Sequence, residues 1–138
     1  MLVTTGIVAP FTFSNSTVWL DAFCTALVTA ASSDAPVIDP DPFAGIYAAV
    51  TRRARSGRVV GASEAVSAGE ALRMYTIQGA YAGGQERETG SIKVGKRADL
   101  ALLDRDPVDV EPEDVLGTKV ALTLIGGMVA WDANGLCS

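Results

Sequence analysis

Histidine is absent from this 138-residue sequence, and only two cysteines, Cys24 and Cys137, are present. Without imidazole the chain cannot build a Ser-His-Asp triad, a Cys-His pair or any zinc site with a histidine ligand. The two cysteines stand near opposite ends of the sequence, which fits no metal-binding or redox spacing. We expect one buried thiol and one exposed thiol in the tail. Any activity of these residues must therefore do without imidazole.

Positive charge is also scarce. No lysine or arginine precedes Arg52, and 16 acidic side chains outnumber 11 basic ones, for a formal net charge of −5. Because neutralised phosphates supply most of the affinity for nucleic acid, we predict no nucleic-acid partner. The N-terminus lacks the positive region of a secretory signal, and the longest uncharged apolar stretch, residues 22–31, is far shorter than the ~20 residues of a membrane span. We predict a cytoplasmic protein with no membrane partner.

The length limits the fold, because a complete (β/α)8 barrel needs about 200 to 250 residues. The composition, with 49% hydrophobic residues, is that of an ordinary globular chain. Residues 1–33 carry the least information, since the apolar stretch 18–29 is compatible with a buried helix and with a buried strand. Both alternatives stay open on the sequence alone.

A proline-rich loop is predicted to lead into a helix. Residues 32–42 contain three prolines, which exclude regular structure. Asp41 is a natural N-cap, and Pro42 suits the first helical position. We expect this helix to end at Gly57, with a solvated run of arginines in its last turn. Its apolar stripe consists of Phe43, Ile46, Tyr47, Val50 and Ala54, and the arginines are Arg52, Arg53 and Arg55.

A second helix is predicted to begin at Ser67, which fits a capping box with Glu70. Gly83-Gly84 should end it, and the polar residues 85–89 then read as a surface linker. Beyond this linker the composition changes from helix formers to strand formers. We therefore place a boundary between two parts of the chain, residues 1–84 and residues 85–138.

The second part is predicted to be β structure. Residues 98–103 form a short apolar run bounded by turn signals, as expected of a strand. Two further runs, 120–125 and 128–131, flank Gly126-Gly127, which indicates a hairpin with a two-residue turn.

One segment carries a distinctive motif. Residues 90–104, GSIKVGKRADLALLD, closely resemble the C-terminal signature of metal-dependent amidohydrolases. Residues 33–37 (SDAPV), 45–53 (GIYAAVTRR) and 70–77 (EALRMYTI) are similar to the formamide-deformylase-like branch, amidohydrolase family 3. The resemblance covers roughly residues 32–132.

This resemblance implies an α/β fold that is the C-terminal fragment of a TIM-barrel metal-dependent hydrolase. Residues 1–84 would be the end of the barrel, with its last strand near residues 26–31, the Asp34 loop and two helices. Residues 85–138 would be part of a small β-sandwich that contains the Gly126-Gly127 hairpin. The chain is accordingly expected to begin close to the last barrel strand of the family.

The resemblance also implies a role for Asp34. In the family the aspartate of this motif ligates the catalytic divalent metal, zinc, and takes a proton from the attacking water. The chemistry is consistent, because a carboxylate beside a divalent ion stays ionised and can deliver that proton to the leaving nitrogen. Asp34 is thus the candidate catalytic residue and the candidate metal ligand.

The family's other metal ligands include a His-x-His pair and further histidines, and none of them exists in this sequence. We therefore expect a hydrolase of non-peptide carbon–nitrogen bonds by descent that is inactive, and holds no metal, as an isolated chain. A separate polypeptide carrying the rest of the barrel would be needed for activity. The alternatives are a non-catalytic binding or oligomerisation module and an unstable truncated product. The apolar stripe and the lone strand near residues 26–31 favour self-association.

Overall fold

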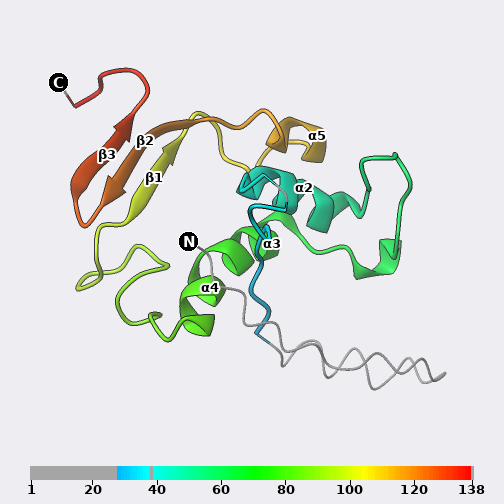
Figure 1. Cartoon of the computed structure of the whole chain (residues 1–138), viewed down its shortest axis with the longest axis horizontal. Coiled ribbons are helices and arrows are strands. Elements are labelled where there is room, and N and C mark those ends of the chain that lie inside the picture. Colours follow the sequence, from blue (N-terminus) through cyan, green and yellow to red (C-terminus); the bar gives the residue numbers. More distant parts are fainter. Residues whose placement is uncertain (1–27, 38, 138) are drawn as a thin grey trace.

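The computed structural model describes residues 28–37 and 39–137 (Figure 1). In this part of the chain, helices pack together beside a three-stranded antiparallel sheet, which makes an α/β fold. The elements follow in the order α2 (Pro42–Thr51), the 3-10 turn η1 (Ala62–Glu64), α3 (Ala68–Tyr75), α4 (Ile77–Ala82), β1 (Leu100–Leu103), α5 (Pro112–Val115), β2 (Val120–Ile125) and β3 (Met128–Asp132). The predicted element at residues 18–29 and the predicted burial of Cys24 fall mostly or wholly outside the described residues, whereas Cys137 is an exposed free thiol.

Helix α2 begins where the sequence predicts. The Asp41 side chain accepts a hydrogen bond from the backbone N–H of Phe43 (2.9 Å), and Pro42 occupies the first helical position. The prediction that this helix continues to Gly57 is wrong, because α2 ends at Thr51 and Arg52 adopts a left-handed backbone with φ of 54°. The arginines that follow therefore lie in a loop.

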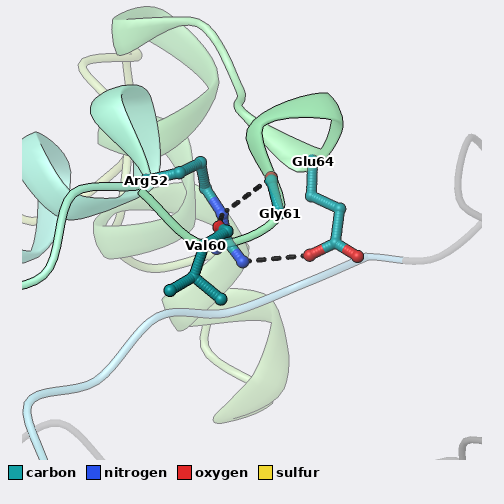
Figure 2. Close-up of polar contacts among 4 residues, drawn as sticks. All are labelled: Arg52, Val60, Gly61 and Glu64. Carbon is teal, nitrogen blue, oxygen red and sulfur yellow. Dashed lines mark hydrogen bonds and ion pairs between the residues drawn. The ribbon is translucent and has the colours of Figure 1, made fainter. Parts of the chain in front are cut away.

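Arg52 itself explains this early end (Figure 2). Its Nε donates to the carbonyl oxygens of Val60 (3.1 Å) and Gly61 (3.3 Å), while Nη2 forms an ion pair with Glu64 at 2.9 Å. The guanidinium of Arg52 thus closes the loop that follows α2. Its partners lie eight to twelve positions after Arg52 in the sequence. Helix spacing alone could not reveal it, because the competing contacts are tertiary.

The second predicted helix is divided into α3 and α4. The capping box is confirmed, since Ser67 Oγ accepts from the Glu70 N–H (3.2 Å) and Glu70 Oε2 accepts from the Ser67 N–H (2.9 Å). Thr76 interrupts the helix with φ of −116° and ψ of −99°, and Gly83 follows the end of α4. Neither helix is long and apolar enough to cross a membrane, and the same holds for every other helix in the described ranges.

The core is small and lies where α2, α3 and α5 meet. Phe43, Ile46, Ala71 and Val115 are buried, and Ile46 and Val115 are each only 1% exposed. Leu103 of β1 and Val120 of β2 are partly buried against this cluster, so it also connects the helices to the sheet. The short helix α5, which supplies Val115, was not predicted from the sequence.

The sheet has the order β1-β2-β3, and both pairs are antiparallel. The predicted hairpin is confirmed: Gly126 (φ 59°) and Gly127 (φ 82°) form the two-residue turn between β2 and β3. Positive φ at both turn positions is what a tight hairpin needs and what glycine adopts without strain. The strand predicted over residues 98–103 is confirmed with a shorter extent, beginning at Leu100.

The prediction of a last barrel strand near residues 26–31 is wrong for residues 28–31, which the structure describes. Residues 28–31 form no strand, and the backbone N–H of Ala31 instead donates to the carbonyl oxygen of Met74 in α3 (3.1 Å). A strand needs a neighbouring strand to satisfy its N–H and C=O groups, and no described segment lies beside these residues as one. Residues 26 and 27 lie outside the described part.

Packing between α2 and α3 gives a first test. A Cβ on Gly45 would lie 1.8 Å from the Tyr75 hydroxyl oxygen, whereas a Cβ on Gly69 would meet only Val108 Cγ1 at 3.8 Å. We expect Gly45→Ala to lower the free energy of unfolding by about 1–3 kcal/mol through overpacking. Gly69→Ala, the matched control in α3, should raise it by up to about 1 kcal/mol through helix propensity. Urea unfolding measures both, and equal stabilisation by the two substitutions would contradict the close α2–α3 contact.

The sheet gives a second test, through pH. Backbone N–H groups of Gly126, Lys119 and Leu136 donate to Asp99, Asp104 and Asp132 respectively and lower the pKa of each carboxyl group. A lowered folded-state pKa contributes stability that is present above the unfolded pKa, about 3.9 for aspartate, and is lost as the pH falls through the folded value. We therefore expect the free energy of unfolding to decrease below about pH 4.

The Asp99→Asn variant should lose part of this acid dependence. Asp109→Asn is the matched control, because the Asp109 side chain accepts no hydrogen bond from a described residue. Urea titrations followed by tryptophan fluorescence at several pH values provide the measurement. An acid dependence that is the same in Asp99→Asn and in the unmodified chain would refute the role of this carboxylate.

Candidate functional site

The predicted site residue, Asp34, lies in the extended segment that precedes α2. The Ala31–Met74 hydrogen bond holds this segment against α3. The Asp34 N–H donates to Ser32 Oγ (3.2 Å), and the Val37 N–H donates to the Asp34 carbonyl oxygen (3.0 Å), which closes a turn. Asp34 therefore sits at the start of a turn whose position is set by contacts on both of its sides.

The backbone of Asp34 is left-handed, with φ of 56°. Non-glycine residues rarely adopt this conformation, although aspartate and asparagine do so more readily than most because of their short polar side chains. Residues held in such conformations concentrate at functional sites. The Asp34 residue is exposed, so its carboxylate is available to a partner from outside the described residues.

The neighbouring carboxylates are occupied by the backbone. Asp39 Oδ1 accepts from the Asp41 N–H (3.2 Å), and Asp41 Oδ1 caps α2. The Tyr75 hydroxyl lies against α2 near this cap, and burial together with the charge of Asp41 raises the pKa of Tyr75. A raised pKa keeps this phenol protonated at neutral pH, so it can donate a hydrogen bond but cannot serve as a base.

The metal implied by the resemblance is not supported by the donors of the described residues. No group of three or more His, Cys, Asp or Glu side chains that could hold a metal occurs within residues 28–37 and 39–137. A catalytic zinc needs about three protein ligands, and a single exposed carboxylate does not provide them. Asp34 is therefore not part of a three-donor metal group in this part of the chain.

Polar residues of the motif 90–104 form hydrogen bonds that hold the neighbouring loop together. Lys96 Nζ donates to the carbonyl oxygens of Glu86 and Thr89 (2.9 Å for Thr89) and to Ser91 Oγ (2.7 Å). These bonds draw the loop between α4 and β1 around one half-buried ammonium group, which is a strong arrangement because the donor is charged. Sequence analysis singled out the motif but did not predict this loop-closing role of Lys96.

Asp99 of the same motif connects this loop to the hairpin. Its Oδ1 accepts from the Gly126 N–H (2.7 Å), and its Oδ2 accepts from Thr89 Oγ1 (3.2 Å). The Gly127 N–H also donates to the Ala98 carbonyl oxygen (2.9 Å). The motif thus fixes the start of β1 to the β2–β3 turn.

The family model described as "Amidohydrolase family" matches residues 12–130. The chain belongs to the amidohydrolase family. This match includes the turn at Asp34, the helices α2 to α4 and the motif of residues 90–104, so these features are parts of an amidohydrolase sequence.

Two curated relatives match most of the amidohydrolase chain. N-substituted formamide deformylase from Arthrobacter pascens is 41% identical over 104 residues, which are 75% of this chain and 19% of the relative. The putative amidohydrolase YtcJ from Bacillus subtilis (strain 168) is 29% identical over 119 residues, or 84% of this chain and 22% of the relative. The chain therefore spans about a fifth of the length of these relatives.

Deaminases match shorter stretches of the chain. A 5-methylthioadenosine/S-adenosylhomocysteine deaminase from Teredinibacter turnerae is 35% identical over 91 residues, which are 65% of this chain and 20% of the relative. A 5'-deoxyadenosine deaminase from Methanobrevibacter smithii is 48% identical over 50 residues, which are 36% of this chain and 12% of the relative. No solved structure matches the chain.

A third prediction tests metal binding at Asp34. Asp34→Asn removes the charge and keeps a residue that tolerates the left-handed backbone, so stability should change by no more than about 0.5 kcal/mol. Excess zinc should shift the melting temperature of the isolated chain and of the variant equally, because no described residue completes a site. Thermal unfolding with and without zinc is the measurement. A zinc-dependent stabilisation that is lost in Asp34→Asn would show that the chain holds a metal at Asp34.

Proposed function

We propose that this chain provides one part of a metal-dependent amidohydrolase that hydrolyses a non-peptide carbon–nitrogen bond, and that Asp34 is its proton-transferring residue. The observation that carries the proposal is the geometry of Asp34: an exposed aspartate with a left-handed backbone, in the segment that leads from the Ala31 contact with α3 to the start of α2. Family membership supports the reaction class. In this proposal residues 1–84 belong to the end of a TIM barrel and residues 85–138 to a small β-sandwich, and the protein acts in the cytoplasm.

The chemistry assigned to Asp34 is a proton transfer in two steps. Its carboxylate accepts a proton from water as the water oxygen bonds to the substrate carbonyl carbon. The resulting carboxylic acid then returns the proton to the nitrogen as the carbon–nitrogen bond breaks. The products are an amine and a carboxylic acid, and Asp34 ends as it began. The divalent metal of the family would require donors beyond Asp34.

The remaining ligands must come from residues outside those described, either elsewhere in a longer protein or on a second polypeptide. One carboxylate cannot assemble the three or more ligands of a catalytic zinc, so we propose that residues 28–137 alone do not catalyse. The exposed position of Asp34 is compatible with ligands supplied from elsewhere.

An amide or formamide is the favoured substrate class. The relative named N-substituted formamide deformylase matches 75% of this chain at 41% identity, whereas the two deaminases match 65% of it at 35% identity and 36% of it at 48% identity. Hydrolysis of an N-substituted formamide would release formate and an amine. The chemistry of Asp34 is the same for either class, so the choice depends on the extent of similarity.

A second candidate is a non-catalytic module that associates with another copy or another chain. The sheet carries several apolar side chains that are about half exposed or more, and exposed apolar surface of this kind can mark an interaction site. These residues are Leu102 (51% exposed), Ile125 (54%), Met128 (75%), Val129 (49%) and Trp131 (59%).

Complementation tests the proposed function. The part of the Arthrobacter pascens relative outside the matched 104 residues would be coexpressed with this chain, and formate release from an N-substituted formamide would be measured. We expect activity for the pair, none for either part alone, and a loss of at least about 100-fold with Asp34→Asn, as for a removed general base.

Outcomes of this experiment separate the candidates. Size-exclusion chromatography with light scattering verifies that the pair forms. A stable pair that stays active with Asp34→Asn would disprove the role of Asp34. A stable pair without activity would leave the association module, and self-association of this chain alone at the same protein concentration would support that module directly.

A further inference from the structure

A cleft separate from Asp34 lies between the α3–α4 segment and the loop that leads to β1. Its volume is about 420 Å³. Arg73 of α3 and Gln78 of α4 line one side, and Lys93 and Lys96 of the loop line the other. We call these four residues and the space between them the cationic cleft. It draws its cations from segments that are well separated in the sequence.

The charge in the cationic cleft is unbalanced. Three basic side chains line it against one carboxylate, that of Glu86, in a chain whose overall charge is −5. Arg52, Arg97 and Arg105 each form an ion pair with a carboxylate, but Arg73 and Lys93 form none with any described residue. Cations gathered in a recess with low-dielectric walls create a positive potential that attracts anions.

Lys96 differs from the other two cations because its position is fixed. Its three hydrogen bonds to the loop hold the ammonium group at the wall of the cleft, although its charge is not neutralised by the carbonyl and hydroxyl groups that accept them. Arg73 and Lys93 are free to turn toward a ligand. Arginine can grip an oxyanion with two parallel hydrogen bonds, and lysine adds a point charge.

Gln78 contributes a second, independent observation. Its Oε1 atom is buried and accepts no hydrogen bond from the described residues. A buried acceptor without a donor is costly, and such an atom in a native structure requires an explanation. The terminal torsion of a glutamine amide is soft, so a small rotation can present this oxygen to a donor in the cleft. A ligand with its own hydrogen-bond donor, such as a hydroxyl group, would supply the missing partner.

We propose that the cationic cleft binds a small oxyanion that carries its own hydroxyl donor, of the class represented by inorganic phosphate. Arg73 and Lys93 hold the charged oxygens, Lys96 adds its field, and Gln78 Oε1 accepts from the P–OH group. Sulfate is the discriminating comparison, because at neutral pH it has four acceptor oxygens and no donor. This site does not depend on the hydrolase proposal, since Asp34 is not among its lining residues.

Binding of phosphate and sulfate to the full 138-residue chain tests the proposal. Isothermal titration at matched ionic strength should give phosphate an affinity at least about tenfold above that of sulfate, a ratio that corresponds to one well-placed hydrogen bond. Arg73→Gln should weaken phosphate binding by about fivefold or more. Gln78→Leu should reduce the preference for phosphate over sulfate and leave sulfate binding nearly unchanged.

Arg58→Gln is the matched control, because Arg58 is an exposed arginine of the loop after α2 that lies outside the cleft. Circular dichroism verifies that each variant is folded. Three results would overturn the proposal: no phosphate binding at millimolar concentration, equal binding of sulfate and phosphate, or an equal loss of affinity in Arg58→Gln and Arg73→Gln. The last result would mean that phosphate responds only to the overall charge.

Discussion

Burial of the inner face of α2 is the constraint on which the rest of the described structure depends. Ile46 and Phe43 are enclosed by α3 and α5, and the partly buried Leu103 and Val120 bring the sheet to the same cluster. Because the described residues include only four buried hydrophobic side chains, each of these contributes a large share of the favourable burial energy of this core. The turn at Asp34 lies between Ala31, which is hydrogen-bonded to α3, and the start of α2, so both of its flanks are connected to this helix pair.

The local signals in the sequence predicted the ends of several elements correctly. Asp41, the Ser67–Glu70 pair and Gly126-Gly127 act through hydrogen bonds and backbone angles that span only a few residues. Such interactions are readable from spacing alone, because both partners lie within the same short window.

Features that depend on distant residues could not be predicted in the same way. Arg52 ends α2 because its guanidinium finds acceptors in a loop further along the chain, and α5 forms because Val115 completes a core made by other helices. The left-handed backbone of Asp34 and the lack of a three-donor metal group among the described residues are likewise tertiary facts. The family resemblance supplied Asp34 as a candidate, whereas sequence alone gave no sign that Arg73 and Lys93 share a cleft.

Asp132 has a consequence for the outer edge of the sheet. Its carboxylate accepts hydrogen bonds from the backbone N–H groups of Asn134, Leu136 and Cys137. These bonds fold the C-terminal residues back around Asp132 at the end of β3. The edge of the sheet formed by β3 is therefore only five residues long and finishes on a charged residue. Short edges closed by charge are a means by which natural sheets resist continuous strand-to-strand stacking between molecules. Strand β3 can therefore offer apolar side chains to a partner, but its short edge limits how many backbone hydrogen bonds a strand of another molecule can form with it.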